Sequence, residues 1–235
     1  MSVIAANLQA VRQRIAAAAQ QAGRPPGDVT LLAVSKTVAP EVVRAAFDAG
    51  QRAFGENYVQ EGIAKITALA DVRNDIAWHF IGPLQSNKTR LVAEHFDWVH
   101  TIERLKIAER LSAQRPAGAL PLQACIQVNI SGEASKSGVA PADVLPLAQA
   151  VAALPGLRLR GLMAIPEPDD DPDGQRRPFA AMRALLGTLR AAGLNVDTLS
   201  MGMSGDVEAA IAEGATIVRV GTAIFGARPY PAQIQ

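Results

Sequence analysis

Short apolar runs alternate with longer amphipathic stretches along almost the whole chain. The most apolar run, at residues 29–35, is bounded by Pro25-Pro26-Gly27 before it and by Pro40 after it. An uninterrupted apolar run of this length is typical of a strand buried in a parallel sheet. Similar runs predict eight strands in all, at residues 29–35, 52–55, 77–81, 97–101, 122–129, 158–164, 196–200 and 216–220.

Helical patterns lie between the expected strands, at about residues 40–49, 57–70, 85–95, 103–114, 141–153, 177–191 and 206–213. One more helix is expected before the first strand, because Ile4, Leu8, Val11 and Ile15 form a single apolar stripe. This alternation predicts an α/β fold, a (β/α)8 TIM barrel with an extra N-terminal helix. A doubly wound open sheet is the alternative, but no GxGxxG motif follows the first strand. The length suits a single domain over residues 1–235.

Composition and charge narrow the classes of function. Apolar residues make up 49% of the 235 positions, and 23 basic residues balance 22 acidic ones. This balance gives no electrostatic case for a nucleic-acid or membrane partner, and no apolar segment is long enough to span a bilayer. The single cysteine, Cys125, is expected in the core of a cytoplasmic protein. None of His79, His95 and His100 has a helical i, i+4 partner suited to zinc, so we expect no metal site.

Lys36 stands at the carboxyl end of the first expected strand. In α/β architectures, ligands bind at the carboxyl ends of the strands. A lysine half-buried there loses hydration, which lowers its pKa toward the range of a nucleophile or a Schiff-base former. The alternative is a lysine whose side chain reaches solvent at the strand end.

Two glycine-bearing turns follow the last two expected strands, at residues 200–205 and at Gly221-Thr222. In barrels, these two loops and a helix N-terminus often hold a phosphate group. Glycine allows the backbone to approach the anion closely, and free N–H groups at a helix start point toward it. Ser204 and Thr222 add hydroxyl donors. The alternative is that Ser204 only caps the following helix.

Arg219 lies inside the last apolar strand, where arginine is rarely buried without a partner. It either pairs with a carboxylate across the barrel or points at a ligand atom that accepts a hydrogen bond. A lysine on the first strand, an arginine on the eighth and a phosphate cradle between the last two strands together fit pyridoxal phosphate. In this arrangement Lys36 would form an aldimine, Arg219 would meet the pyridine nitrogen, and the turns would hold the phosphate.

Seven motifs occur in a fixed order along the chain. They are AVSKTV at 33–38, FGENYVQE at 54–61, WHFIGPLQSNK at 78–88, VNISGEASKSG at 128–138, GLMAIP at 161–166, SMGMSGD at 200–206 and VRVGTAIFGAR at 218–228. With these motifs the chain closely resembles the pyridoxal phosphate homeostasis protein family, the single-domain relatives of the alanine racemase N-terminal barrel. The resemblance implies a fold-type-III barrel that binds the cofactor through Lys36 and buffers and delivers it, with no established turnover.

The resemblance also implies the cofactor contacts, which map onto Lys36, Asn57, Ser204, Arg219, Gly221 and Thr222. Two further residues are considered as second contacts. His79 either lines the pocket or is a hydrogen-bonded core histidine. Lys136 either contacts the phosphate transiently, as the cofactor enters or leaves, or is a solvated loop lysine. The acidic stretch at 167–174 is expected to be a solvated loop after the sixth strand.

Three functions are compared: a cofactor carrier, an amino-acid racemase and a Schiff-base aldolase acting on a phosphorylated substrate. An arginine facing the pyridine nitrogen keeps that atom neutral, which makes the cofactor a poor electron sink. Racemisation needs an acid/base group on each face of the α-carbon. Alanine racemases take the second group from another domain and from the dimer partner, and we expect no such domain before Gln235. The aldolase would bind no chromophore. We therefore expect a cytoplasmic, monomeric, non-catalytic carrier that contacts apo pyridoxal phosphate enzymes transiently, with a pyridoxal phosphate-dependent racemase as the alternative.

Overall fold

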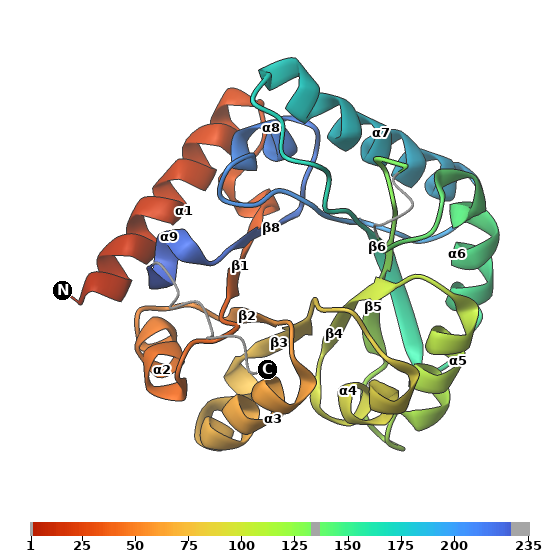
Figure 1. Cartoon of the computed structure of the whole chain (residues 1–235), viewed down its shortest axis with the longest axis horizontal. Helices are drawn as coiled ribbons and strands as arrows, with labels where there is room; N and C mark the ends of the chain where they lie inside the picture. The colour runs from red at the N-terminus through yellow and green to blue at the C-terminus, as the bar shows by residue number, and fades with distance from the viewer. Residues whose placement is uncertain (1, 133–136, 227–235) are drawn as a thin grey trace, which may run out of the picture.

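Eight parallel strands form a closed barrel in the computed structural model, which describes residues 2–132 and 137–226. Each strand is hydrogen-bonded to the next, and the last pairs with the first, so the predicted barrel is confirmed and the open sheet is not observed (Figure 1). The strands are β1 (Thr30–Val34), β2 (Ala53–Glu56), β3 (Ala77–Phe80), β4 (Trp98–Ile102), β5 (Leu122–Gln127), β6 (Leu157–Met163), β7 (Thr198–Ser200) and β8 (Ile217–Val220).

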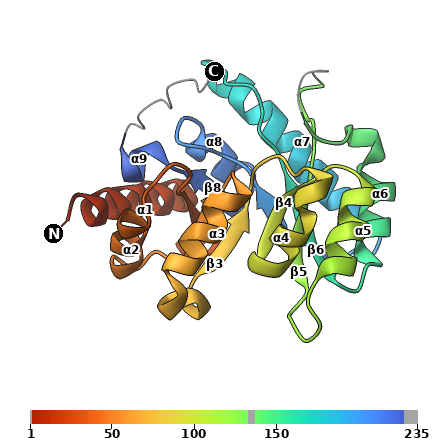
Figure 2. The ribbon, with the colours of Figure 1, turned by 60° about the horizontal axis from the view of Figure 1, so that its bottom comes forward.

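Helices surround the barrel on the outside, as Figure 1 shows in a view down its interior. They are α1 (Val3–Gln21), α2 (Pro40–Asp48), α3 (Val59–Ala68), α4 (Thr89–His95), α5 (Leu105–Gln114), α6 (Val144–Ala152), α7 (Pro172–Ala191), α8 (Val207–Ala212) and α9 (Thr222–Phe225). Helix α1 is the expected extra helix. It buries Leu8, Val11 and Ile15 and packs against α8 and α9. Both views show α9 beside α1 (Figure 2).

The acidic stretch at 167–174 differs from the expectation, because its last three residues are helical. Helix α7 begins at Pro172, five residues before the expected start at 177. Asp171 caps it by accepting a hydrogen bond from the amide of Gly174 at 2.9 Å, and Pro172 occupies the first helical position. A proline there leaves no intrahelical hydrogen bond unmade. The expected solvated loop is therefore wrong for residues 172–174.

The strands present two different layers, because successive side chains point to opposite faces. Outward-facing residues such as Phe54, Trp78 and Phe80 pack against the helices in the main core. A smaller cluster inside the barrel contains Leu32, Val34, Ala53, Ile81 and Ile217. Four buried polar side chains share the interior layer with this apolar cluster: His79, His100, Ser200 and Arg219.

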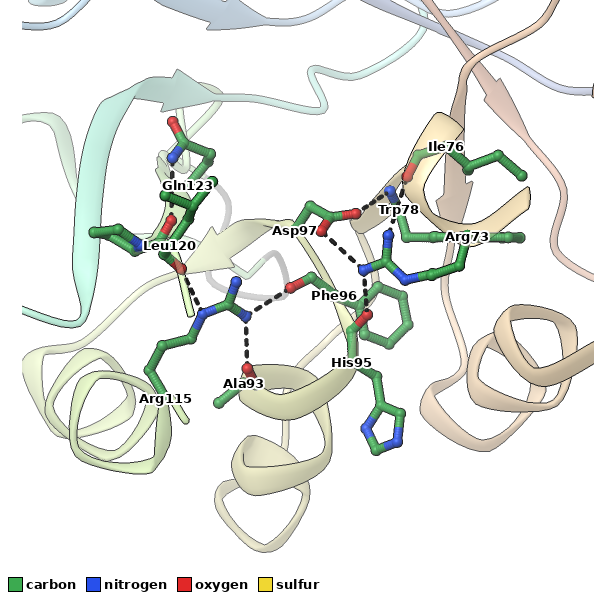
Figure 3. Close-up of polar contacts among 11 residues, drawn as sticks. Arg73, Ile76, Trp78, Ala93, His95, Phe96, Asp97, Arg115, Leu120 and Gln123 are labelled. Atoms are coloured by element: carbon green, nitrogen blue, oxygen red, sulfur yellow. Dashed lines mark hydrogen bonds and ion pairs between the residues drawn. The ribbon is translucent and has the colours of Figure 1, made fainter. Parts of the chain in front are cut away.

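The amino-terminal face of the barrel is held together by two arginines (Figure 3). Arg73 donates to the carbonyl of His95 at 3.0 Å and pairs with Asp97 at 2.8 Å, and Asp97 accepts from the amide of Trp78 at 2.8 Å. Arg115 donates to three backbone carbonyls, those of Ala93, Phe96 and Leu120, at 2.6–2.8 Å. Burial lowers the pKa of Arg115 from its usual value. In barrels this face supports stability and leaves ligand binding to the opposite face.

Within the described residues, no helix combines the length and the apolar character needed to cross a bilayer. Across the same residues, no group of three His, Cys, Asp or Glu side chains is arranged to hold a metal ion. Cys125 is fully buried in β5, and burial raises the pKa of its thiol to about 12. The thiol is therefore neutral and unreactive at physiological pH.

Candidate functional site

A cavity of about 330 Å³ opens at the carboxyl ends of the strands. The six residues expected to contact a cofactor all line it, although they come from four separate segments of the chain. Four apolar side chains and one more glycine complete the wall. The full lining is Val34, Lys36, Asn57, Ile81, Ile165, Met203, Ser204, Gly205, Arg219, Gly221 and Thr222. The structure thus brings together the residues that the sequence singled out, at the face where barrels bind ligands.

Lys36 lies two residues beyond the end of β1 and is partly buried. A second lysine, Lys65 of α3, forms a hydrogen bond with the backbone of the residue before Lys36. Lys65 Nζ donates to the carbonyl oxygen of Ser35 at 2.5 Å, to Glu56 Oε1 at 2.8 Å and to Glu61 Oε1 at 2.6 Å. The Ser35 hydroxyl donates to Glu56 Oε1 at 2.5 Å. We call Ser35, Glu56, Glu61 and Lys65 the lysine support cluster.

The backbone after Lys36 is also constrained. Thr37 has φ of 62°, in the left-handed region that a β-branched residue rarely adopts. Its amide donates to the carboxylate of Glu61, so the lysine support cluster holds both neighbours of Lys36. Conformations of this kind cost on the order of 1–3 kcal/mol and persist only when their surroundings enforce them. The position of Lys36 is therefore fixed by its neighbours' contacts as well as by its own.

Burial dominates the electrostatics of the lysine support cluster. Glu56 is fully buried and Lys65 is 2% exposed. Desolvation raises the pKa of Glu56, although the charge of Lys65 and the hydrogen bonds from Lys65 and Ser35 oppose this shift. Glu56 Oε2 has no hydrogen-bond partner among the described residues. One ammonium therefore compensates two carboxylates directly beneath the lysine of the cavity.

Arg219 is a buried cation with neutral partners. It is 4% exposed, and it donates to Ser200 Oγ at 3.0 Å and to the carbonyl of Ala164 at 2.9 Å. Among the described residues its hydrogen-bond partners are these two neutral oxygens, so the predicted alternative of an ion pair across the barrel is not observed there. Desolvation lowers its pKa to about 10, with Asp206 opposing the shift. The guanidinium stays protonated at neutral pH and borders the cavity.

Ser204 lies in the loop between β7 and α8. It is not the cap of α8, because Asp206 occupies that position and accepts from the amide of Met203 at 2.5 Å. The Ser204 carbonyl accepts from Arg14 Nη1 at 2.8 Å, and Arg14 also pairs with Glu208 of α8 at 2.5 Å. The extra N-terminal helix therefore anchors this loop. Sequence reasoning missed Arg14, since it saw only the apolar stripe of that helix.

Gly221 and Thr222 form the second turn. Gly221 is buried at the end of β8, and Thr222 is the first residue of α9 and is exposed. The amide groups of Ile224 and Phe225 donate to the Gly221 carbonyl. Because that carbonyl points into the short helix, the amides at the start of α9 are directed outward, as free amides at helix starts are. Ser204 and Thr222 both line the cavity.

Asn57 directly follows β2 and also lines the cavity. Its side-chain oxygen is buried and has no hydrogen-bond partner among the described residues. Gly82 packs against its backbone so closely that a Cβ at residue 82 would lie 2.0 Å from the Asn57 carbonyl oxygen. A side chain at residue 82 would therefore displace Asn57 from the cavity. Buried polar groups in native structures are nearly always paired, so the free amide oxygen indicates a place for a ligand.

His79 and Lys136 were considered as further contacts of the cofactor. His79 does not line the cavity. It is 3% exposed inside the barrel, its Nδ1 lies 2.9 Å from Nε2 of His100, and its ring stacks on Trp98 with centroids 5.1 Å apart. The structure therefore supports the core-histidine alternative for His79. Lys136 lies outside the described residues.

His100 occupies the interior of the barrel. It lies inside β4 and is fully buried. The strand runs one residue further than expected, from Trp98 to Ile102, because Ile102 pairs with Ile126 of β5 after a register shift. Alternation along β4 then directs His100 inward, next to Ser200 and Arg219.

The chain is similar to known proteins over nearly its whole length. Residues 6–229 match the family described as alanine racemase, N-terminal domain. The chain is 62% identical over 232 residues to the pyridoxal phosphate homeostasis protein of Pseudomonas aeruginosa, and covers 99% of each chain. It is 57% identical over 231 residues to the protein of that name from Escherichia coli, covering 98% of this chain and 99% of that one.

A solved structure gives the same result. PipY of Synechococcus elongatus, in a structure with pyridoxal phosphate bound, is 38% identical, with a TM-score of 0.82 over 95% of this chain and 100% of that chain. Sequence and fold agree over nearly the whole length of both proteins. The chain therefore belongs to the pyridoxal phosphate homeostasis protein family, within the alanine racemase N-terminal domain family.

Proposed function

We propose that this protein binds pyridoxal phosphate in the cavity at the carboxyl face of its barrel and holds it for release to other proteins, without turning over a substrate. The observation that carries the proposal is the convergence of Lys36, Arg219 and the two hydroxyl-bearing turns on one cavity. The relatives named for pyridoxal phosphate homeostasis support it, as does the cofactor bound to PipY.

The cavity fits the cofactor by three features of the structure. Its volume of about 330 Å³ lies in the range of small-molecule sites. Arg219 is a buried cation that lacks an ion-pair partner among the described residues, so it has N–H donors to spare. The amide oxygen of Asn57 is buried and unpaired within the same part of the chain. The buried cation and the unpaired amide oxygen are both costly without a ligand, and a ligand that bonds to them relieves that cost.

The residues of the cavity have distinct roles in the proposal. When bound, the cofactor supplies an aldehyde with which a primary amine condenses. Lys36 provides that amine, and the lysine support cluster orients it. Ser204, Gly221 and Thr222 hold the phosphate, while Arg219 faces the ring nitrogen and keeps it unprotonated. Asn57 holds the opposite edge of the ring.

The composition of the wall favours a carrier over a racemase. Racemisation needs two groups that exchange a proton, one on each face of the reacting carbon. Among the described lining residues, Lys36 is the only amine, and none is a carboxylate, imidazole, phenol or thiol. Arg219 holds its proton too firmly to serve, with a pKa of about 10. One face of the carbon is therefore left without a partner in the part of the wall that the structure describes.

Chemical trapping tests the binding proposal. Protein incubated with pyridoxal phosphate should absorb visible light, and borohydride reduction should leave a pyridoxyl group on Lys36 that peptide mass spectrometry can locate. Lys36→Ala should remove both signals. Lys106→Ala, on the exposed surface of α5, should retain both. A colourless wild-type protein, or an adduct confined to other lysines, would refute the assignment.

Transfer and turnover measurements test the carrier proposal. The loaded protein should restore activity to an apo pyridoxal phosphate enzyme when the two are mixed. It should leave L-alanine and L-serine stereochemically unchanged. Racemisation of either amino acid at rates typical of enzymes, about 1–10³ per second, would favour the racemase instead.

A further inference from the structure

Four polar side chains form a continuous row through the interior of the barrel, which we call the interior network: Arg219, Ser200, His100 and His79. Arg219 Nη1 lies 3.0 Å from Ser200 Oγ, His100 Nδ1 lies 2.8 Å from the same oxygen, and His100 Nε2 lies 2.9 Å from His79 Nδ1. Every member is at most 4% exposed. A row this deeply buried must satisfy its own hydrogen bonds, because water does not reach it.

The protons of the interior network can be assigned from donor and acceptor capacity. A guanidinium only donates, so Ser200 Oγ accepts from Arg219. Ser200 Oγ contacts only Arg219 and His100 among the described residues, so its own hydrogen has one available acceptor, His100 Nδ1. The reverse assignment would leave the Ser200 hydroxyl hydrogen without an acceptor in a fully buried position, which would disfavour it by one to two orders of magnitude.

The remaining protons follow from that first assignment. Because Nδ1 of His100 accepts, its neutral ring carries the hydrogen on Nε2, and this hydrogen points at His79 Nδ1. His79 then also carries its hydrogen on Nε2. Burial keeps both rings neutral, since it lowers the pKa of His79 to about 3 and that of His100 well below its usual value. In every hydrogen bond of the row, the donor is therefore the residue nearer to Arg219 and the acceptor is the residue farther from it.

Resting on the proposed function, we propose that Ser200, His100 and His79 are positioning residues for Arg219: a one-way hydrogen-bond row, with both imidazoles neutral and protonated on Nε2, that fixes the guanidinium toward the ring nitrogen of the bound cofactor. Each acceptor in the row points toward the cation, so the row stabilises its charge without supplying a carboxylate. A carboxylate beside Arg219 would compete with the ligand for its N–H donors. The two neutral acceptors, Ser200 Oγ and the Ala164 carbonyl, take one hydrogen bond each from Nη1 and Nη2, which leaves the other N–H donors of the guanidinium for the ligand.

The first test needs no ligand. Histidine labelled with ¹⁵N in the free protein should give the neutral, Nε2-protonated pattern for His79 and His100 in long-range ¹H–¹⁵N spectra. Neither pattern should change between about pH 5 and pH 8, the range in which an ordinary histidine titrates. A hydrogen on Nδ1 of His100, or protonation of either ring in that range, would overturn the proposal whether or not the protein binds cofactor.

The second test uses two ligands that differ at one atom, pyridoxal phosphate and its 1-deaza analogue, which has carbon in place of the ring nitrogen. His100→Leu and Ser200→Ala should each weaken pyridoxal phosphate by about three- to tenfold, the loss expected for one buried hydrogen bond, and leave the analogue within about twofold. His100→Asn retains an acceptor near the position of Nδ1 and should recover most of the affinity. His95→Gln, on α4, is the matched control and should change neither.

The outcomes separate the two proposals. If the wild type binds neither ligand, the proposed function fails, and the spectra alone decide the proton assignment. If the wild type binds pyridoxal phosphate but both variants weaken the two ligands equally, the function stands and the positioning role is refuted. Ser200→Ala removes a single oxygen, so it provides a folded variant if His100→Leu does not fold.

Discussion

Lys65 Nζ lies 2.5 Å from the carbonyl oxygen of Ser35, the residue directly before Lys36. The buried Lys65 thus fixes the backbone next to Lys36, the lysine that lines the cavity. The contact joins α3 to the end of β1 across 30 positions of the sequence. It also brings a positive charge to Glu56 and Glu61, whose carboxylates would otherwise repel each other at close range.

Replacing Lys65 should destabilise the protein strongly. In Lys65→Met the two carboxylates lose their common partner, and an unpaired buried charge typically costs about 3–5 kcal/mol. Urea unfolding measures the change, with Lys106→Met on the exposed face of α5 as the control. The same variant should trap less pyridoxyl group on Lys36 at a fixed cofactor concentration. A loss of less than about 1 kcal/mol would show that the lysine support cluster is not a structural unit.

The pH dependence of stability should report on Glu56. Its pKa in the folded protein is raised above the ordinary value of 4.5, chiefly by desolvation. Between these two values the folded state holds more protons than the unfolded state, so the contribution of Glu56 to stability falls as pH rises through this window. Glu56→Gln does not titrate. Its unfolding free energy should therefore improve relative to wild type across that window, and a constant difference would contradict the raised pKa.

Arg14 should matter for the phosphate end of the ligand. Arg14→Ala removes the donor that holds the Ser204 carbonyl, so the loop should hold the phosphate less firmly. We expect pyridoxal phosphate affinity to fall by about three- to tenfold, while pyridoxal without its phosphate changes little. Arg24→Ala is the control, because Arg24 donates to the carbonyl of Ile211 near the other end of α8. Equal losses for both ligands would place Ser204 away from the phosphate.

Arg115 should affect stability alone. Arg115→Ala leaves the carbonyls of Ala93, Phe96 and Leu120 without their charged donor, on the face opposite the cavity. A loss of about 2 kcal/mol in unfolding free energy is expected, since hydrogen bonds to charged groups are among the stronger ones. Arg90→Ala, on the exposed side of α4, should change stability by less than about 0.5 kcal/mol. Cofactor affinity should match wild type in both variants.

The sequence predicted those site residues whose chemical type is unusual for their place in an expected strand or turn. Lys36 and Arg219 are polar residues in or beside apolar strands, and the two glycine turns follow consecutive strands, so their meeting in the barrel could be predicted. Lys65 could not be found in this way. Its spacing from Glu61 on α3 is that of an ordinary exposed i, i+4 pair, and only tertiary packing turns it under β1.

Other differences have equally local causes. Helix α7 was expected to start at 177, but it starts at Pro172, with Asp171 as its cap. The acidic and proline-rich composition of this segment is typical of a loop, so it hid the start of the helix. The interior network was missed because its members lie on three different strands besides β8, and no sequence spacing relates them. Burial of all four emerges only from the closure of the barrel.

The pairing of β1 with β8 has a consequence for the order in which the protein acquires its ligand. Leu32 of β1 pairs with Arg219 of β8, so the first and the eighth strand of the barrel are immediate neighbours although about 190 residues separate them in the sequence. A nascent chain that lacks β8 carries Lys36 but has neither the guanidinium nor the second turn. The complete cavity wall therefore exists only after all eight strands have been made, so a ligand held by that wall stabilises the closed barrel and none of its partial precursors.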